Sequence, residues 1–268
     1  MTNDERLHIK EMGLTSLASI ASELFLDIEQ IYQGTMVSAQ ELDIDSRDRG
    51  VIAQIESLGG GDVLVVAVRE KGLKDRYVEE VIKHVGVRQG LPITFYGVSE
   101  PYLTFARRFI GNISAIPPEA GIYDGLLSKP ELERFFSALG VLSRSKIYLN
   151  PARMVSVDQI ERNAKKQNEL GEQGLILLDC LQSMVGSEFR LEVPGSSLIK
   201  LKQLAIEIGV VVVVMYQLDS SVQDHPATLT RLELREVEEL VRLADSICLL
   251  SNDKGGFKLD LPKIQIKS

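Results

Sequence analysis

One carboxylate stands at the end of an apolar run in the second half of the chain. The four apolar residues 175–178 (LILL) are followed directly by Asp179. This order is typical of a buried parallel strand that delivers an acid to the carboxyl edge of a sheet. In a nucleotide-hydrolysing fold, an acid at that position holds the water shell of Mg²⁺. A purely structural interpretation stays open beside the chemical one, because apolar runs that end in Asp are common in α/β proteins.

A pattern of alternating strands and helices surrounds Asp179 from residue 59 onward. Such alternation predicts a parallel sheet whose strands are joined by crossover helices. We expect strands at residues 63–68, 92–96, 146–149, 175–178, 210–215 and 246–250. We expect helices at residues 74–88, 101–111, 130–143, 156–171, 196–208 and 231–243, and a final hairpin that turns at residues 254–256.

The first fifty residues have a different pattern from the rest. Residues 16–32 place five apolar side chains at helical spacing, namely Leu17, Ile20, Leu24, Ile28 and Ile31. This spacing predicts one amphipathic helix, which we expect to dock on its own domain rather than on a partner. The acidic stretch at residues 40–49 is typical of a solvated connector. We therefore expect a helical extension at residues 1–50 and a main domain at residues 51–268.

Composition and charge exclude several classes of protein. No run of eighteen apolar residues is present, and the polar start of the chain lacks a signal-peptide pattern, so we expect a cytoplasmic protein without a membrane span. The formal net charge of −8 argues against a broad nucleic-acid surface, although a local basic loop remains open. Two cysteines without metal-ligand spacing are interpreted as reduced thiols, and three scattered histidines argue against a histidine metal site.

Three blocks of sequence occur together in an order found in a known family. They are the stretch around Asp179-Cys180-Leu181-Gln182, the ungapped LKQLAIEIGVVVVVMYQL at residues 201–218, and LREVEELVRLADSICLL at residues 234–250. From about residue 58 to its end, the chain resembles the C-terminal, RecA-like domain of DnaB-type replicative helicases. The resemblance implies an α/β fold, namely a RecA-like P-loop NTPase core with a mainly parallel central sheet. It also implies ATP and Mg²⁺ as cofactors, single-stranded DNA and replication proteins as partners, and a homo-oligomer.

The phosphate-binding loop is where the chain departs from this family. Such a loop needs glycines whose N–H groups wrap the phosphates, a lysine for the β- and γ-phosphates, and a Ser or Thr hydroxyl for Mg²⁺. Arg69 and Lys74 fall at the family's positions, but Leu73 replaces the glycine and Asp75 replaces the hydroxyl residue, with Gly72 one place early. Leucine resists backbone conformations that glycine permits, and the Asp75 carboxylate would repel a phosphate unless Mg²⁺ offset the repulsion.

Further positions of the resemblance are altered or weakly matched. The family's water-polarising acid is replaced by Ser99, with Glu100 one residue later, while Gln217 matches the family's residue that senses the γ-phosphate. The family's trans-acting Lys and Arg correspond to Lys263 and Gln265. The loop at residues 185–195 matches the family's DNA-contacting loop in place, and its Arg190 is a candidate for a phosphate contact. A solvent-facing arginine without a ligand stays open as the structural interpretation.

These departures leave several functional hypotheses. The leading one is a DnaB-like, replication-associated protein whose nucleotide site has decayed and which acts as a non-catalytic interaction subunit. The rival is an active ATP-dependent single-stranded DNA translocase, with Lys74 on the phosphates, Asp75 and Asp179 on Mg²⁺, and catalytic roles for Glu100 and Gln217. A third is a nucleotide-free RecA-like oligomer that organises DNA. In each case the helix at residues 16–32 is a candidate for docking on a neighbouring subunit.

Overall fold

The computed structural model describes residues 9–32, 42, 49–116, 124–171, 174–185, 193–218, 238–253 and 256–260, with side chains described only as far as Ser251. Its centre is one sheet with the strand order β1-β4-β3-β5-β6-β2-β7-β8. The six strands from β4 to β7 pair in parallel, whereas β1 and β8 are antiparallel to their neighbours at the two edges. The expected mainly parallel sheet is confirmed.

The strands follow the apolar runs of the sequence. The parallel strands are β2 (Val63–Val68), β3 (Ile93–Tyr96), β4 (Ile147–Leu149), β5 (Leu175–Leu178), β6 (Val211–Gln217) and β7 (Ser246–Asp253). The short β1 (Thr15–Ser16) pairs with β4, and β8 (Gly256–Asp260) pairs with β7. Asp253 lies opposite Gly256, so the antiparallel hairpin that the sequence predicted is confirmed, while Lys254 and Gly255 at its turn lie outside the described residues.

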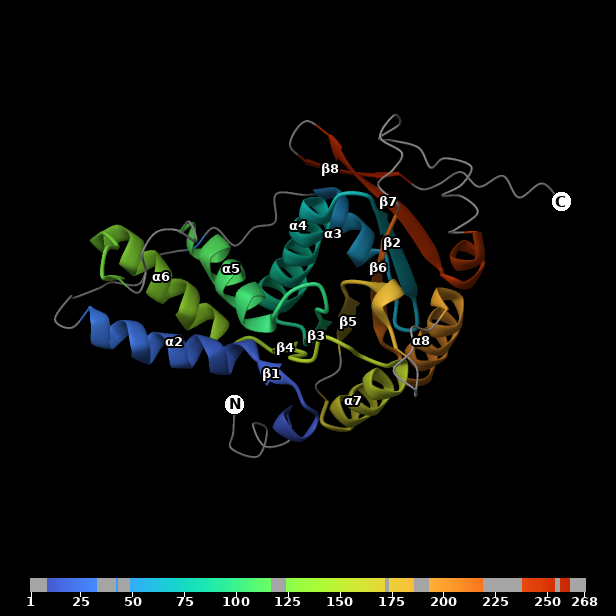
Figure 1. Cartoon of the computed structure of the whole chain (residues 1–268), viewed down its shortest axis with the longest axis horizontal. Coiled ribbons are helices and arrows are strands. Elements are labelled where there is room, and N and C mark those ends of the chain that lie inside the picture. Colours follow the sequence, from blue (N-terminus) through green and yellow to red (C-terminus); the bar gives the residue numbers. More distant parts are fainter. Residues whose placement is uncertain are drawn as a thin grey trace.

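Helices cover both faces of the sheet (Figure 1). One face packs against α2 (Leu17–Ile31), α3 (Arg49–Glu56), α4 (Lys71–Val81), the π-helix η1 (Ile82–Arg88), α5 (Tyr102–Ser114) and α6 (Lys129–Leu142). The other face packs against α7 (Val157–Glu169), α8 (Pro194–Ile208) and the helical residues 238–243. Successive side chains of β2 alternate between the two cores, because neighbouring residues of a strand point to opposite faces.

The N-terminal helix docks on its own chain, as its apolar stripe predicts. Ser16 caps α2 by accepting a hydrogen bond from the Ser19 N–H, at 3.3 Å. Leu17, Leu24 and Ile28 are buried in the core that the sheet shares with α5 and α6. Ile31 departs from the expected stripe, since it is 42% exposed at the end of the helix. The domain boundary at residue 50 stays a prediction.

The start of α4 differs from the expectation. The predicted helix at residues 74–88 begins three residues earlier, at Lys71, and continues beyond Val81 as the seven-residue π-helix η1. The reason is that the Glu70 carbonyl accepts hydrogen bonds from the N–H groups of both Leu73 and Lys74, which closes the first helical turn. In the described part of the chain, no helix is long and apolar enough to cross a membrane.

Candidate nucleotide-binding edge

The carboxyl ends of four parallel strands bring the predicted site residues to one edge of the sheet. Arg69 follows β2, Ser99 lies three residues after β3, Asp179 follows β5, and Gln217 ends β6. Because parallel strands end on the same side, these residues lie near one another although they are far apart in sequence. The edge thus unites residues that the sequence singled out separately.

Asp179 is held by the backbone of the neighbouring strand end. Its Oδ1 accepts a hydrogen bond from the Val98 N–H and its Oδ2 accepts one from the Ser99 N–H, both at 3.0 Å. The residue is only 5% exposed. The carboxylate therefore fixes the turn that follows β3, in addition to any role toward a ligand.

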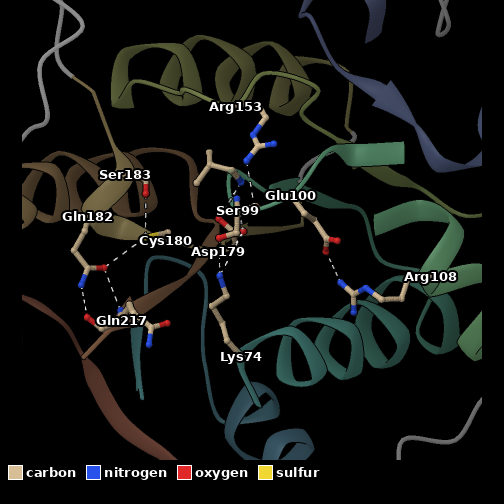
Figure 2. Close-up of polar contacts among 11 residues, drawn as sticks. Lys74, Ser99, Glu100, Arg108, Arg153, Asp179, Cys180, Gln182, Ser183 and Gln217 are labelled. Atoms are coloured by element: carbon tan, nitrogen blue, oxygen red, sulfur yellow. Dashed lines mark hydrogen bonds and ion pairs between the residues drawn. The ribbon is translucent and has the colours of Figure 1, made fainter. Parts of the chain in front are cut away.

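Lys74 points inward to the same group (Figure 2). Its Nζ donates a hydrogen bond to Ser99 Oγ at 2.7 Å and lies 3.7 Å from Asp179 Oδ2. The lysine is 4% exposed, which makes this a buried ion pair rather than a solvated contact. The ammonium, the hydroxyl and the carboxylate form one closed polar cluster, which we call the Lys74 cluster.

The chain before Lys74 is helical rather than looped. The N–H groups of Leu73 and Lys74 both donate to the Glu70 carbonyl, at 3.2 and 3.1 Å. Leu73 is buried in the core at 5% exposure. Gly72 has no positive φ, and a Cβ on it would meet nothing within 4 Å. Neither the conformation nor the packing of Gly72 requires glycine.

Gln217 joins the end of β6 to two other segments. Its Nε2 donates to the Arg69 carbonyl at 2.6 Å, and its backbone N–H donates to Gln182 Oε1 at 3.1 Å. The Gln182 side chain returns a hydrogen bond to the Gln217 carbonyl. Arg69 therefore meets the site through its carbonyl, and Gln217 links the segments that follow β2 and β5.

Glu100 belongs to a second cluster, formed with Arg108, Glu79 and Asn112. The Arg108 guanidinium binds the carboxylates of both Glu79 and Glu100, and Asn112 Nδ2 donates to Glu79 Oε2 at 2.6 Å. Figure 2 shows Glu100 directed toward Arg108. Burial raises the pKa of Glu79, although its hydrogen bonds to Arg108 and Asn112 lower it. Burial lowers the pKa of Arg108, but the carboxylates of Glu79 and Glu100 outweigh this effect and raise it. No sequence pattern indicated Arg108, because its two partners lie on different segments, Glu79 on α4 and Glu100 before α5.

The carboxylate of Asp75 interacts electrostatically with Arg108 and Glu100 of this second cluster. Partial burial raises the pKa of its carboxyl group, while Lys74 and Arg108 lower it and Glu100 raises it further. Asp75 and Asp179 are the predicted metal ligands, and the described residues contain no group of three or more His, Cys, Asp or Glu that could hold a metal ion. Arg190, Lys263 and Gln265 lie outside the described residues.

Comparisons with known proteins agree with this architecture. The model of the DnaB-like helicase C terminal domain matches residues 51–259. The chain is 25% identical over 219 residues to the replicative DNA helicase DnaB of Synechocystis sp., covering 80% of this chain and 24% of that protein. It is 24% identical over 200 residues to DnaB of Geobacillus stearothermophilus, covering 72% and 43%. The chain thus spans less than half the length of these relatives.

Two solved structures share the fold. The first is an ATPase domain, with a TM-score of 0.67 at 18% identity over 89% of this chain and 84% of that one. The second is a DnaB-like replicative helicase described with its interactions with primase, with a TM-score of 0.64 at 18% identity over 86% and 57%. At this identity the likeness establishes the RecA-like fold, in agreement with the sequence resemblance.

Proposed function

This chain belongs to the family of DnaB-like helicase C-terminal domains, and we propose that it is a cytoplasmic, non-catalytic member whose nucleotide site is degenerate. In this proposal the RecA-like core serves as a DNA- or replisome-interaction subunit. The observation that carries the proposal is the state of Lys74. The lysine that should reach the phosphates is instead 4% exposed and paired internally with Asp179 and Ser99.

The first turn of α4 supports this proposal. A phosphate loop offers successive free N–H groups to the anion, and a glycine lets the backbone approach it closely. Here the N–H groups of Leu73 and Lys74 are bound by the Glu70 carbonyl, and the Leu73 side chain is anchored in the core. Opening the turn to wrap a phosphate would break two backbone hydrogen bonds and expose Leu73.

The negative charge of Asp75 also supports the proposed loss of nucleotide binding. A carboxylate at position 75 would stand where the family places a hydroxyl. At about 4 Å from a phosphate charge, with an effective dielectric of about 20, the repulsion is about 4 kcal/mol, which is roughly a thousandfold in affinity. The residues as arranged do not fit ATP and Mg²⁺, and they support no hydrolytic step. Glu100, which binds Arg108, is likewise not placed as a free base.

The interaction role is proposed from the family. Single-stranded DNA would contact the segment that contains Arg190, replication proteins such as a primase would bind the outer surface, and copies of the chain would form an oligomer. The apolar stripe of α2 is already used within its own chain, where Leu17, Leu24 and Ile28 are buried. The oligomer of this proposal therefore does not need that stripe as an intersubunit contact.

Nucleotide binding is the decisive experiment. We expect a fluorescent ATP analogue to give a flat titration at micromolar protein, with and without Mg²⁺, and we expect no ATP turnover above background. Lys71→Ala serves as a matched control for Lys74→Ala, because Lys71 is an exposed lysine in the same helical turn. ATP hydrolysis at motor-like rates that Lys74→Ala abolishes and Lys71→Ala preserves would overturn the proposal.

An active ATP-dependent single-stranded DNA translocase is the second candidate. It is favoured by one observation, namely that Lys74, Asp179 and Gln217 gather at the same sheet edge. This candidate requires Mg²⁺-dependent nucleotide binding that single-stranded DNA enhances. The third candidate, a nucleotide-free oligomer that organises DNA, requires DNA affinity that falls steeply with salt. An electrophoretic shift that does not respond to salt would count against it.

A further inference from the structure

A pocket of about 290 Å³ lies at the opposite edge of the sheet from the Lys74 cluster. Gly174 and Leu175 open β5, Val211 opens β6, and Leu91 precedes β3, so the pocket lies at the amino ends of the parallel strands. The apolar lining is completed by Ile55 from the end of α3, by Leu58 two residues beyond that end, and by Val85 from η1. Its volume is below that of most drug-sized ligand sites and suits one or two side chains.

The pocket has one charged wall. Among the described residues that line it, Glu56 and Gln89 supply the polar side chains, and none is basic. Glu56 ends α3, whose last turn carries no basic residue. The carbonyl end of a helix bears a partial negative charge, so the carboxylate and the helix end act together on the same side of the pocket. This wall favours a cation.

Glu56 is held in place without being covered. His84 Nε2 lies 3.1 Å from both Glu56 Oε1 and Gln89 Nε2. A single ring nitrogen either donates or accepts, so it hydrogen-bonds one of the two at a time, and Glu56 is the partner when Nε2 carries the proton. His84 is 4% exposed, and its Nδ1 is buried without a hydrogen-bond partner among the described residues. The Glu56 side chain itself keeps 52% of its surface exposed. A carboxylate that is oriented from behind and open in front is suited to bind an incoming group.

The π-helix η1 also borders the pocket, through Val85. A run of seven π-helical residues is rare, and such widened turns occur frequently at functional sites. The chain leaves it through hydrogen bonds from Gln89 N–H to the His84 carbonyl and from Leu91 N–H to the Val85 carbonyl, both at 3.0 Å. This exit leaves Leu91 on the rim with 49% of its surface exposed. The exposed leucine extends the apolar lining of the pocket to its mouth, next to the Glu56 carboxylate.

We propose that this pocket docks a segment of a partner protein that presents an aliphatic side chain directly beside a lysine or arginine. The aliphatic side chain fills the cup between Val85, Leu175 and Val211, and the cation meets Glu56 and the end of α3. Charge complementarity selects this occupant, because an acidic or purely polar segment would meet the Glu56 carboxylate and an apolar floor. The inference stands apart from the proposed loss of nucleotide chemistry, since it uses no residue of the nucleotide edge.

The test uses short peptides as probes for the full chain. Acetylated and amidated Gly-Leu-Lys-Gly, Gly-Leu-Glu-Gly and Gly-Ser-Lys-Gly are titrated into protein labelled at Ile, Leu and Val methyl groups. We expect saturable shifts of the Val85, Leu175 and Val211 methyl signals with the Leu-Lys peptide. We expect binding at least about tenfold weaker for the Leu-Glu peptide, because an attraction becomes a repulsion, and for the Ser-Lys peptide, because the apolar anchor is lost.

Two variants make the test specific. Glu56→Gln should bring the Leu-Lys and Leu-Glu peptides to similar affinities, whereas Glu23→Gln, on the exposed face of α2, should change neither. Leu91→Ala should weaken both leucine peptides without unfolding the protein, since Leu91 is on the rim. Unsaturable or unselective shifts would overturn the proposal. Methyl shifts that depend on protein concentration alone would also overturn it, because a second copy of the chain would then be the occupant.

Discussion

The ammonium of Lys74 and the carboxylate of Asp179 face each other inside the protein, with Nζ 3.7 Å from Oδ2. Both side chains are almost fully buried, at 5% and 6% exposure. A buried ion pair gains little over an apolar pair of the same shape, but the loss of one partner leaves an uncompensated charge in the interior. The packing of α4, of the end of β5 and of the turn after β3 therefore requires that both charges of this pair are present.

Replacement of Asp179 should therefore destabilise the fold strongly. In Asp179→Asn the Lys74 ammonium loses its counter-charge, and the new amide presents a donor to one of the N–H groups of Val98 and Ser99. We expect a loss of about 3–5 kcal/mol in the free energy of unfolding, measured by urea denaturation. The control Asp158→Asn, an exposed acid 3.9 Å from Lys200, should change stability by about 0.5 kcal/mol or less. Equal effects of the two substitutions would contradict the buried-pair interpretation.

Restoration of the family's phosphate-loop residues should restore nucleotide binding. The double variant Leu73→Gly with Asp75→Thr removes the buried anchor and supplies a glycine and a hydroxyl on either side of Lys74. The loss of the carboxylate alone removes a repulsion worth roughly a thousandfold in affinity. We expect Mg²⁺-dependent binding of a fluorescent ATP analogue by the double variant.

The single variants are the controls for this restoration. Asp75→Asn removes the charge but keeps the closed helical turn, so it should bind much more weakly than the double variant. Leu73→Gly keeps the carboxylate, and it should also lose about 2–5 kcal/mol of stability because a buried leucine is removed. If the double variant is folded and still gives a flat titration, residues other than Leu73 and Asp75 also prevent nucleotide binding.

Much of the fold was predictable because strands and crossover helices are local patterns. The apolar run before Asp179 became β5, and the strand expected at residues 210–215 became β6 (Val211–Gln217), paired in parallel with β5 as expected. The start of α4 was predicted wrongly, since Gly72 and Lys74 suggested a loop that ended at the lysine. Burial of Leu73 and the Glu70 carbonyl decided in favour of helix, and burial is a property of tertiary packing.

The polar clusters of the site were only partly predictable. Asp179 and Gln217 were recognised because each ends an apolar strand and matches a family position. Arg108 was not, because its contacts to Glu79 and Glu100 depend on how α5 packs beside α4. The structure adds to the Glu100 prediction one partner that the sequence did not indicate, namely the guanidinium of Arg108, eight residues later.

Acid should weaken the junction between α8 and β7 through Asp245. Although partial burial opposes ionisation, hydrogen bonds from Lys202 Nζ and the Val63 N–H lower the pKa of Asp245 below its ordinary value of 3.8. A lowered pKa contributes stability that is present above 3.8 and is lost as the pH falls through the lower, folded-state pKa. Asp245→Asn should therefore be less stable than the wild type at pH 7.

The pH dependence separates this effect from simple loss of packing. The difference in unfolding free energy between the wild type and Asp245→Asn should shrink as the pH falls below 3.8, as monitored by circular dichroism in urea. If the stability difference between the wild type and Asp245→Asn stays constant across the acidic range, the substitution acts through side-chain packing rather than through the charge of Asp245.

Two glycine substitutions should have opposite effects on stability, and the contrast tests the conformation before Lys74. Gly72 lies within α4 with open space around its would-be Cβ, so Gly72→Ala should stabilise the protein by about 0.5–1 kcal/mol through helix propensity. Gly174 is different, since a Cβ there would lie 2.2 Å from the Pro92 carbonyl oxygen. Gly174→Ala should therefore destabilise by about 1–3 kcal/mol, because backbone must move. Thermal unfolding of both variants measures the difference in stability.

The closed turn before Lys74 would be contradicted by one outcome. If Gly72→Ala were destabilising and also altered nucleotide binding, residues 71–74 would form a phosphate loop in solution.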